Sequence, residues 1–204
     1  MTAKFITFEG SEGSGKSTQA ALVYNYLRQQ GRPVLNIREP GGVKISEAVR
    51  KILLDVENKT MTGECETLLY MAARAQLVSE VITPALKKGM VVLCDRFLDS
   101  TVAYQGYGNG GNIKFIKTLG KFVTHGIAPD LTLLFDIDTK QGLARTNRVK
   151  DRIERRSLEY HGRVRRGYLT LARQESKRIK VINVDASKEE IFARVKKLID
   201  KVIK

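Results

Sequence analysis

Residues 5–18 read FITFEGSEGSGKST, a short apolar run followed by a glycine-rich loop. Residues 10–17 fit the pattern GxxxxGK[ST], in which glycines let several backbone N–H groups turn inward to hold phosphate. The pattern is most informative between a strand and a helix, because the helix N-terminus also favours anions. Here the apolar run ends at Phe8 and helical spacing begins at Lys16. The stretch predicts a phosphate-binding loop whose lysine reaches the β and γ phosphates and whose Ser17 hydroxyl binds Mg²⁺.

Further short apolar runs, rich in β-branched residues, follow along the chain. They cover residues 34–37, 90–94, 131–135 and 181–184. Such runs are typical of strands that are buried on both faces. Stretches with the apolar spacing of helices lie between them, including residues 16–30, 43–54 and 64–88. This alternation predicts an α/β fold, a five-stranded and mostly parallel sheet with helices on both faces, formed by residues 1–204 as a single domain.

Three local signals add detail to this fold. Capping-box spacing at residues 138–141 and 187–190 predicts that two more helices begin there, with Asp138 as a cap rather than a catalytic group. The glycine-rich stretch GYGNGG at 106–111 predicts a loop. Ligands of parallel sheets bind beyond the carboxyl ends of the strands, so we expect functional residues in the loops that follow them.

The composition describes a basic globular chain. Its 204 residues include 36 Lys and Arg against 22 Asp and Glu, a formal charge of +14, and 42% of them are hydrophobic. Cys65 and Cys94 lack CxxC spacing and a nearby histidine, so neither a disulfide framework nor a zinc site is expected, and a reduced, cytoplasmic location fits best. No uncharged run reaches about 18 residues, so no membrane span is expected. The charge alone allows nucleic acid, an anionic membrane or small phosphorylated ligands as partners.

Charged residues end the second and third predicted strands. Asp95 can hold Mg²⁺ through water and Arg96 can hold a second phosphate group, although a structural Asp–Arg pair is the alternative. Arg38 opens the segment REPGG, which is either a further phosphate contact at the same sheet edge or only a turn. GTPases carry NKxD where this chain reads NRVK at 147–150, and helicase-like motors place a glutamate where Arg96 stands. Guanine switches and motors are therefore disfavoured.

Together these segments resemble the bacterial thymidylate kinases, which are P-loop nucleoside monophosphate kinases. The resemblance covers nearly the whole chain. It depends on EGSEGSGKST at 9–18, REPGG at 38–42, DRFLDSTVAYQG at 95–106 and DRIE at 151–154. The second and third of these motifs are specific to that family among P-loop kinases. The resemblance implies transfer of the γ-phosphoryl group of ATP to dTMP, giving dTDP and ADP in dTTP biosynthesis, with Mg²⁺ as cofactor.

The same resemblance implies a role for each matching residue. The ATP-binding residues are Gly10, Ser11, Glu12, Gly13, Ser14, Gly15, Lys16, Ser17 and Thr18. The dTMP-binding residues are Glu12, Arg38, Tyr70, Arg74, Arg96, Ser100, Thr101, Tyr104 and Gln105. The catalytic residues are Lys16, Arg96 and Arg152, and the Mg²⁺ ligands are Ser17 and Asp95. The two acceptor-phosphate arginines are Arg38 and Arg96, and Glu12 lies near the 3′-hydroxyl.

Four of these residues form pairs that would recognise the base, and a fifth would recognise the sugar. Tyr70 and Arg74 lie at i and i+4 on one predicted helix, as a stacking ring and a donor to the base would. The resemblance implies that Ser100 and Thr101 contact the thymine edge. It also implies that Tyr104 lies against the sugar where a 2′-hydroxyl would stand, which would favour deoxyribose. Many relatives have Phe in place of Tyr70, whose hydroxyl needs a partner or water.

The segment 145–156 contains six basic and two acidic residues. One interpretation is a solvated helix face or a nucleic-acid arm. The other is a mobile lid that closes over ATP, with Arg152 reaching the transferred group. We favour the lid because no arginine lies between Gly10 and Lys16, and relatives of that kind supply the catalytic arginine from a lid.

ATP and dTMP are the expected partners, and neither nucleic acid nor a membrane is expected. A nucleic-acid-binding ATPase is the alternative function, because the charge of +14 and the phosphate loop would suit it too. Thymidylate kinases are typically dimeric through their helices, which implies a homodimer, but the apolar face at 64–88 could equally be internal core. His125 and His161 have no metal-ligand spacing, so we expect surface or packing roles for both.

Overall fold

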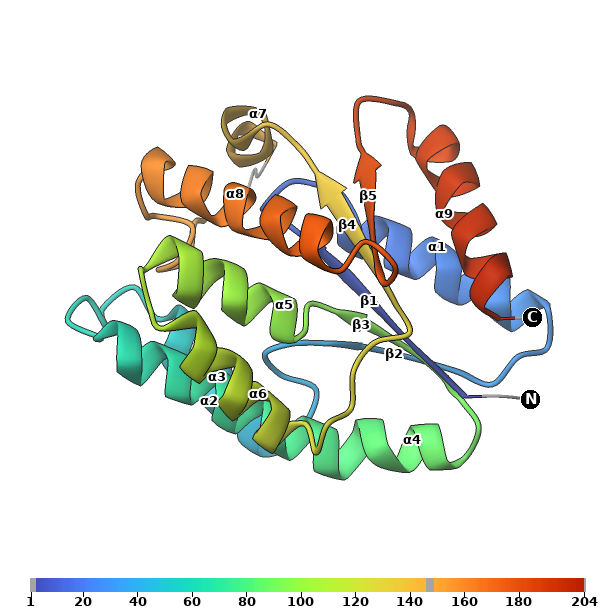
Figure 1. Cartoon of the computed structure of the whole chain (residues 1–204), viewed down its shortest axis with the longest axis horizontal. Helices are drawn as coiled ribbons and strands as arrows, with labels where there is room; N and C mark the ends of the chain where they lie inside the picture. Colours follow the sequence, from blue (N-terminus) through green and yellow to red (C-terminus); the bar gives the residue numbers. More distant parts are fainter. Residues whose placement is uncertain (1–2, 146–148, 204) are drawn as a thin grey trace.

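The computed structural model describes residues 3–145 and 149–203, and a single sheet of five strands forms its centre (Figure 1). The strands are β1 (Lys4–Gly10), β2 (Val34–Arg38), β3 (Val91–Asp95), β4 (Leu131–Asp136) and β5 (Ile179–Asn183). Their order across the sheet is β2-β3-β1-β4-β5, and every neighbouring pair is parallel. All strands therefore end at one edge. The predicted fold class is confirmed.

Helices cover both faces of the sheet. One face carries α1 (Lys16–Gln29) and α9 (Lys188–Val202), which pack on each other (Figure 1). The other face carries α3 (Gly63–Leu77), the π-helical segment η1 (Val78–Ile82), α4 (Thr83–Lys87), α5 (Leu98–Thr101), the π-helical segment η2 (Val102–Gly108) and α8 (Leu158–Gln174). The remaining helices are α2 (Lys44–Leu54), α6 (Ile113–Val123) and α7 (Thr139–Ala144). Both α2 and α6 pack against α3.

Side chains of the central strand β1 alternate between two cores. Ile6 and Phe8 are fully buried in the cluster beneath α1 and α9, and Phe5 is buried in the cluster on the opposite face. Burial on both faces explains why the sequence shows a continuous apolar run rather than alternation. Glu9, however, is a fully buried carboxylate on the same strand, one residue before the glycine-rich loop.

The prediction of a loop at 106–111 was wrong for its first half, because η2 continues the helix through Gly108. The glycines serve close packing instead of a turn. A Cβ on Gly108 would come within 2.7 Å of the Tyr160 ring on α8, and one on Gly106 within 3.1 Å of Ile113 on α6. Side chains larger than hydrogen would push these helices apart.

Both predicted capping signals are confirmed. The Asp138 carboxylate accepts from the backbone N–H groups of Lys140 and Gln141 at the start of α7. Ser187 and Glu190 form a complete capping box at the start of α9. No helix among the described residues is long and apolar enough to cross a membrane.

Candidate active site

The loop between β1 and α1 is held by glycines in left-handed conformations. Gly15 precedes the first turn of α1 with φ 80°, and Gly13 has φ 69°. A Cβ on Gly13 would lie 2.0 Å from the carbonyl oxygen of Gly142 on α7, so only glycine fits there. Lys16 is buried beneath this loop with its Nζ 3.5 Å from the Ser11 carbonyl oxygen. Burial lowers the pKa of Lys16, and the nearby Arg96 lowers it further.

The two predicted metal ligands, Ser17 and Asp95, meet at the base of the loop. The hydroxyl of Ser17, in the first turn of α1, donates a hydrogen bond to the carboxylate of Asp95, the last residue of β3. The two side chains come from positions 78 residues apart in the sequence. A hydroxyl beside a carboxylate is an oxygen donor set of the kind that Mg²⁺ prefers.

Arg96 lies directly above the end of β3, in a left-handed backbone conformation with φ 71°. Its Nη2 lies 2.5 Å from Glu12 Oε1 and its Nη1 donates to the Gly10 carbonyl oxygen at 3.0 Å. The guanidinium also stacks over the Tyr104 ring, 5.1 Å from its centroid. Burial opposes its charge, but Tyr104 and Glu12 keep the pKa of Arg96 well above the ordinary value. The second predicted phosphate-binding arginine is therefore fixed against the first residue of the phosphate loop.

A cleft opens beside Arg96 and encloses about 620 Å³ of unfilled space, including its open mouth. Seven other predicted substrate-binding residues line it, namely Glu12, Tyr70, Arg74, Ser100, Thr101, Tyr104 and Gln105. They come from the phosphate loop, α3 and the α5–η2 helix. With Arg96, eight of the nine predicted dTMP-binding residues therefore line one cleft.

The family model for thymidylate kinase matches residues 8–195 of this chain. The chain belongs to the thymidylate kinase family. It is 51% identical over 195 residues to a thymidylate kinase of Kosmotoga olearia, covering 95% of this chain and 93% of that protein. It is 46% identical over 200 residues to one of Symbiobacterium thermophilum, covering 98% and 94%. The crystal structure of thymidylate kinase from Ehrlichia chaffeensis superposes with a TM-score of 0.82 at 32% identity, covering 98% of this chain and all of that one.

One predicted substrate residue does not line the cleft of this thymidylate kinase family member, although it contacts Pro40, which does. Arg38 is half-exposed, and its guanidinium binds the Pro40 carbonyl oxygen and Glu47 Oε1, each at 2.9 Å. Arg50 of α2 lines the cleft instead and donates to the same Pro40 carbonyl at 2.9 Å. Sequence reasoning missed Arg50. Its only signal was its place one turn after Glu47 on the helix that follows REPGG.

The proposed base-binding pair is held in two different ways. Arg74 is almost completely buried, with its Nε 2.7 Å from Glu39 Oε2 and its Nη1 donating to Thr101 Oγ1 at 3.0 Å. Tyr70 is half-buried one turn earlier on α3, and burial raises the pKa of its phenol above the ordinary value. The Glu39 carboxylate, which also lines the cleft, thereby orients Arg74. Glu39 lay within REPGG but its part in the site was not predicted.

The predicted lid arginine is engaged with a buried carboxylate. Arg152 Nη2 lies 2.7 Å from Glu66 Oε2, and its Nε donates to the Leu53 carbonyl oxygen at 2.8 Å. Arg156 lies at 2.7 Å from the same Glu66 oxygen. Residues 152–155 form a turn and residues 149–151 are not helical, so the interpretation of this segment as a solvated helix face is wrong for residues 149–156. Arg152 does not line the cleft, whereas its neighbours Asp151 and Ile153 do. Residues 146–148 of the predicted lid lie outside the described residues.

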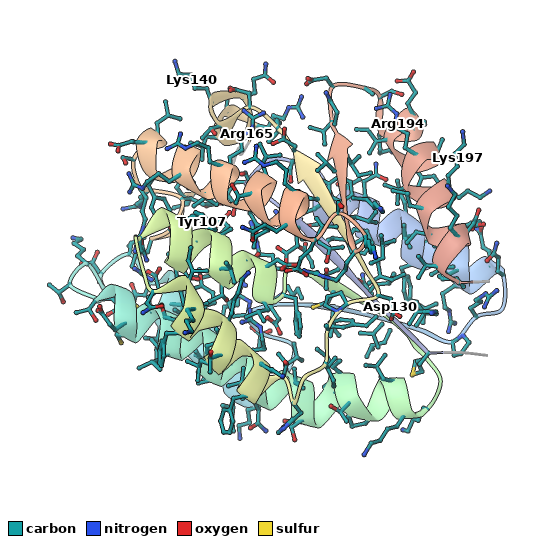
Figure 2. All side chains as sticks on the ribbon, in the orientation of Figure 1. Tyr107, Asp130, Lys140, Arg165, Arg194 and Lys197 are labelled. Atoms are coloured by element: carbon teal, nitrogen blue, oxygen red, sulfur yellow. The ribbon has the colours of Figure 1, made fainter. Side chains whose placement is uncertain are left out.

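Other charged groups at this edge have structural partners. Asp136 at the end of β4 binds Arg165 of α8 through two hydrogen bonds of 2.7 and 2.9 Å. Figure 2 shows Arg165 close to α7, on which Lys140 points outward. His161 is buried and packs edge-on against Tyr160, and His125 is exposed, which agrees with the packing and surface roles expected for them.

Proposed function

We propose that the cleft binds dTMP and that residues 10–18 bind ATP, so that the chain acts as an ATP-dependent dTMP kinase, the activity of its family. The γ-phosphoryl group of ATP passes to dTMP, giving ADP and dTDP for dTTP biosynthesis. One observation carries the assignment: Arg96 contacts both the cleft and the Gly10 carbonyl at 3.0 Å. The loop proposed to bind ATP and the arginine proposed to bind the acceptor phosphate therefore lie next to each other, as in-line transfer requires.

The acceptor set is assigned by position in the cleft. Tyr70 stacks on the thymine ring, and Arg74 and Thr101 face its polar edge. Tyr104, whose hydroxyl lies 3.3 Å from Glu12 Oε1, occupies the space beside the sugar and excludes a 2′-hydroxyl. Arg96 and Arg50 bind the acceptor phosphate, and Arg50 takes the part expected of Arg38. Gln105 holds the wall of the cleft by donating to Glu66 Oε1 at 2.9 Å.

The chemistry requires electrostatic help rather than a general base. The second pKa of a phosphomonoester is about 6, so the attacking oxygen of dTMP is mostly ionised at neutral pH. The barrier arises because this anion must approach a triphosphate. Lys16 and Arg96 place positive charge next to the negative charge of the transferred phosphoryl group. Their burial strengthens this attraction by excluding water.

Ser17 and Asp95 are proposed to hold Mg²⁺, the former directly and the latter through water. Their direct hydrogen bond places both oxygens at the donor loop, which fits the ion. When bound, the ion neutralises phosphate charge and orients the β and γ phosphates.

Arg152 is proposed to stabilise the transferred phosphoryl group as part of a lid that residues 145–156 form. To do so its guanidinium must exchange the Glu66 carboxylate for nucleotide phosphate. Such an arginine is worth about 10³ to 10⁵ in rate.

We propose a cytoplasmic homodimer that binds neither nucleic acid nor membrane. Three arginines of residues 152–165 are engaged within the chain: Arg152 and Arg156 bind the buried Glu66 carboxylate, and Arg165 binds the partly exposed Asp136. The dimer would cover the exposed apolar side chains of α2, α3 and α6. These are Ile45, Ile52, Leu68, Phe115 and Phe122. Sedimentation of the protein at micromolar concentration tests this, and a monomer would refute it.

Steady-state ADP production tests the function class. With Mg²⁺ and ATP, dTMP should stimulate ADP release and chelation of the metal should abolish it. Stimulation by DNA or RNA but not by dTMP would instead support a nucleic-acid-dependent ATPase.

A further inference from the structure

A buried polar network connects the end of β1 to the acceptor arginine, and two of its members, Glu9 and Tyr168, have no role assigned above. Its centre is Glu9, whose side chain is completely buried. The carboxylate accepts three hydrogen bonds: from the Phe97 backbone N–H at 2.7 Å, from the Ser100 hydroxyl at 2.5 Å and from the Tyr168 hydroxyl at 2.9 Å. These donors come from the loop after β3, from α5 and from α8.

The two hydroxyls also contact Arg96. Its Nη1 donates to Ser100 Oγ at 3.3 Å and to Tyr168 Oη at 3.2 Å. Both hydroxyls accept from the guanidinium, and they also lie 2.7 Å from each other, so their two protons are shared between Glu9 and this contact. A hydroxyl that donates its single proton to Glu9 turns its lone pairs toward Arg96.

The direction of these bonds depends on a carboxylate at position 9. Above pH 7 the carboxyl group of Glu9 is ionised and only accepts hydrogen bonds, whereas an amide nitrogen in its place would donate to the hydroxyls. The hydroxyl protons would then turn toward the guanidinium, which is also a donor. Glu9 additionally fixes Phe97, the residue directly after the left-handed Arg96, so both the backbone and the side chain of Arg96 are held from below.

We infer that Glu9 and Tyr168 are positioning residues for phosphoryl transfer, which act by aiming the Arg96 guanidinium at the acceptor phosphate. The inference rests on the proposed role of Arg96 as an acceptor-phosphate ligand. It assigns Ser100, whose hydroxyl is committed to Glu9 and Arg96, to the same network rather than to the thymine edge.

The test uses Tyr168→Phe and Glu9→Gln, which remove or reverse one hydrogen-bonding group each. Thr7→Val is the matched control, because Thr7 is buried on the same strand and bonds to Thr132 at 2.8 Å without touching Arg96. Losing a hydrogen bond to a charged group should lower kcat/KM for dTMP at least about tenfold in both test variants, with the KM for ATP little changed. The control should stay within about threefold of the parent protein. Thermal melting identifies any variant that fails to fold, and either test variant alone decides the point.

A double-mutant cycle with Arg96→Lys separates positioning from general stability. If Tyr168 acts through Arg96, Tyr168→Phe should cost much less in the Arg96→Lys background than in the parent. Equal losses in the two backgrounds, or parent-like kcat/KM for dTMP in either folded test variant, would overturn the inference. A normal kcat/KM for dTMP in Arg96→Lys itself would instead refute the proposed acceptor role of Arg96.

Discussion

The buried carboxylate of Glu9 should make the protein less stable as the pH rises, and Glu9→Gln should remove this dependence. Burial, reinforced by the charge of Asp99, raises the pKa of Glu9 from 4.5 to about 7. The folded protein therefore binds a proton that the unfolded chain releases between these two values. Its contribution to stability is complete below pH 4.5 and is lost as the pH rises through 7.

The size of the effect follows from the shift in pKa. Each pKa unit corresponds to about 1.4 kcal/mol, so the shift of Glu9 is worth about 3 kcal/mol in the free energy of unfolding. Glutamine cannot ionise, so subtracting the variant from the parent removes the titration of all other groups.

Urea denaturation of both proteins at intervals from pH 5 to pH 8.5 measures this difference. We expect Glu9→Gln to gain stability relative to the parent by between 2 and 3 kcal/mol, to order of magnitude, as the pH rises across that range. It should lose activity at the same time, because the network that holds Arg96 is disrupted. A difference in stability that does not change with pH would refute the assignment of a shifted, buried carboxyl group at position 9.

Three further variants test individual assignments. Arg152→Ala should lower kcat by at least about 10³ with a modest change in the KM for dTMP, and near-normal turnover in rapid-quench assays would exclude its catalytic role. Tyr104→Ala should narrow the ratio of kcat/KM between deoxyribose and ribose monophosphates, and an unchanged ratio would remove its part in sugar selection. Arg50→Ala should raise the KM for dTMP about tenfold or more, because it removes a charged phosphate contact, whereas Arg38→Ala should change it less; the reverse order in initial-rate assays would restore Arg38 to the site.

The strands and the phosphate loop could be predicted because their signals are local. Continuous apolar runs identify strands that are buried on both faces, and the spacing of glycines before Lys16 is that of loops that bind phosphate. The loop prediction at 106–111 failed because glycine is found both in turns and at close contacts between helices, and the sequence alone does not distinguish the two. Only the packing of Gly108 against Tyr160 distinguishes the two.

The position of a site residue could be predicted where it directly follows a strand, because the end of the strand places it at the edge of the sheet. Arg96 follows a strand end directly, so its place at the sheet edge was secure. Arg38 also ends a strand, yet its side chain turns toward Glu47, and Arg50 from the next helix reaches the cleft. The partner of Arg152 could not be inferred, because Glu66 lies on α3, far away in the sequence. Such pairings depend on how helices pack on one another, which spacing along the chain does not encode.

The proposed dTMP kinase activity requires that this cleft present thymidylate to the phosphate loop. Initial rates of ADP formation with saturating ATP and Mg²⁺, measured with dTMP, dUMP, dCMP, dGMP and AMP as acceptors, test this requirement. We expect the highest kcat/KM for dTMP, and loss of that activity in Arg96→Ala. Turnover of dTMP no better than that of AMP would contradict it.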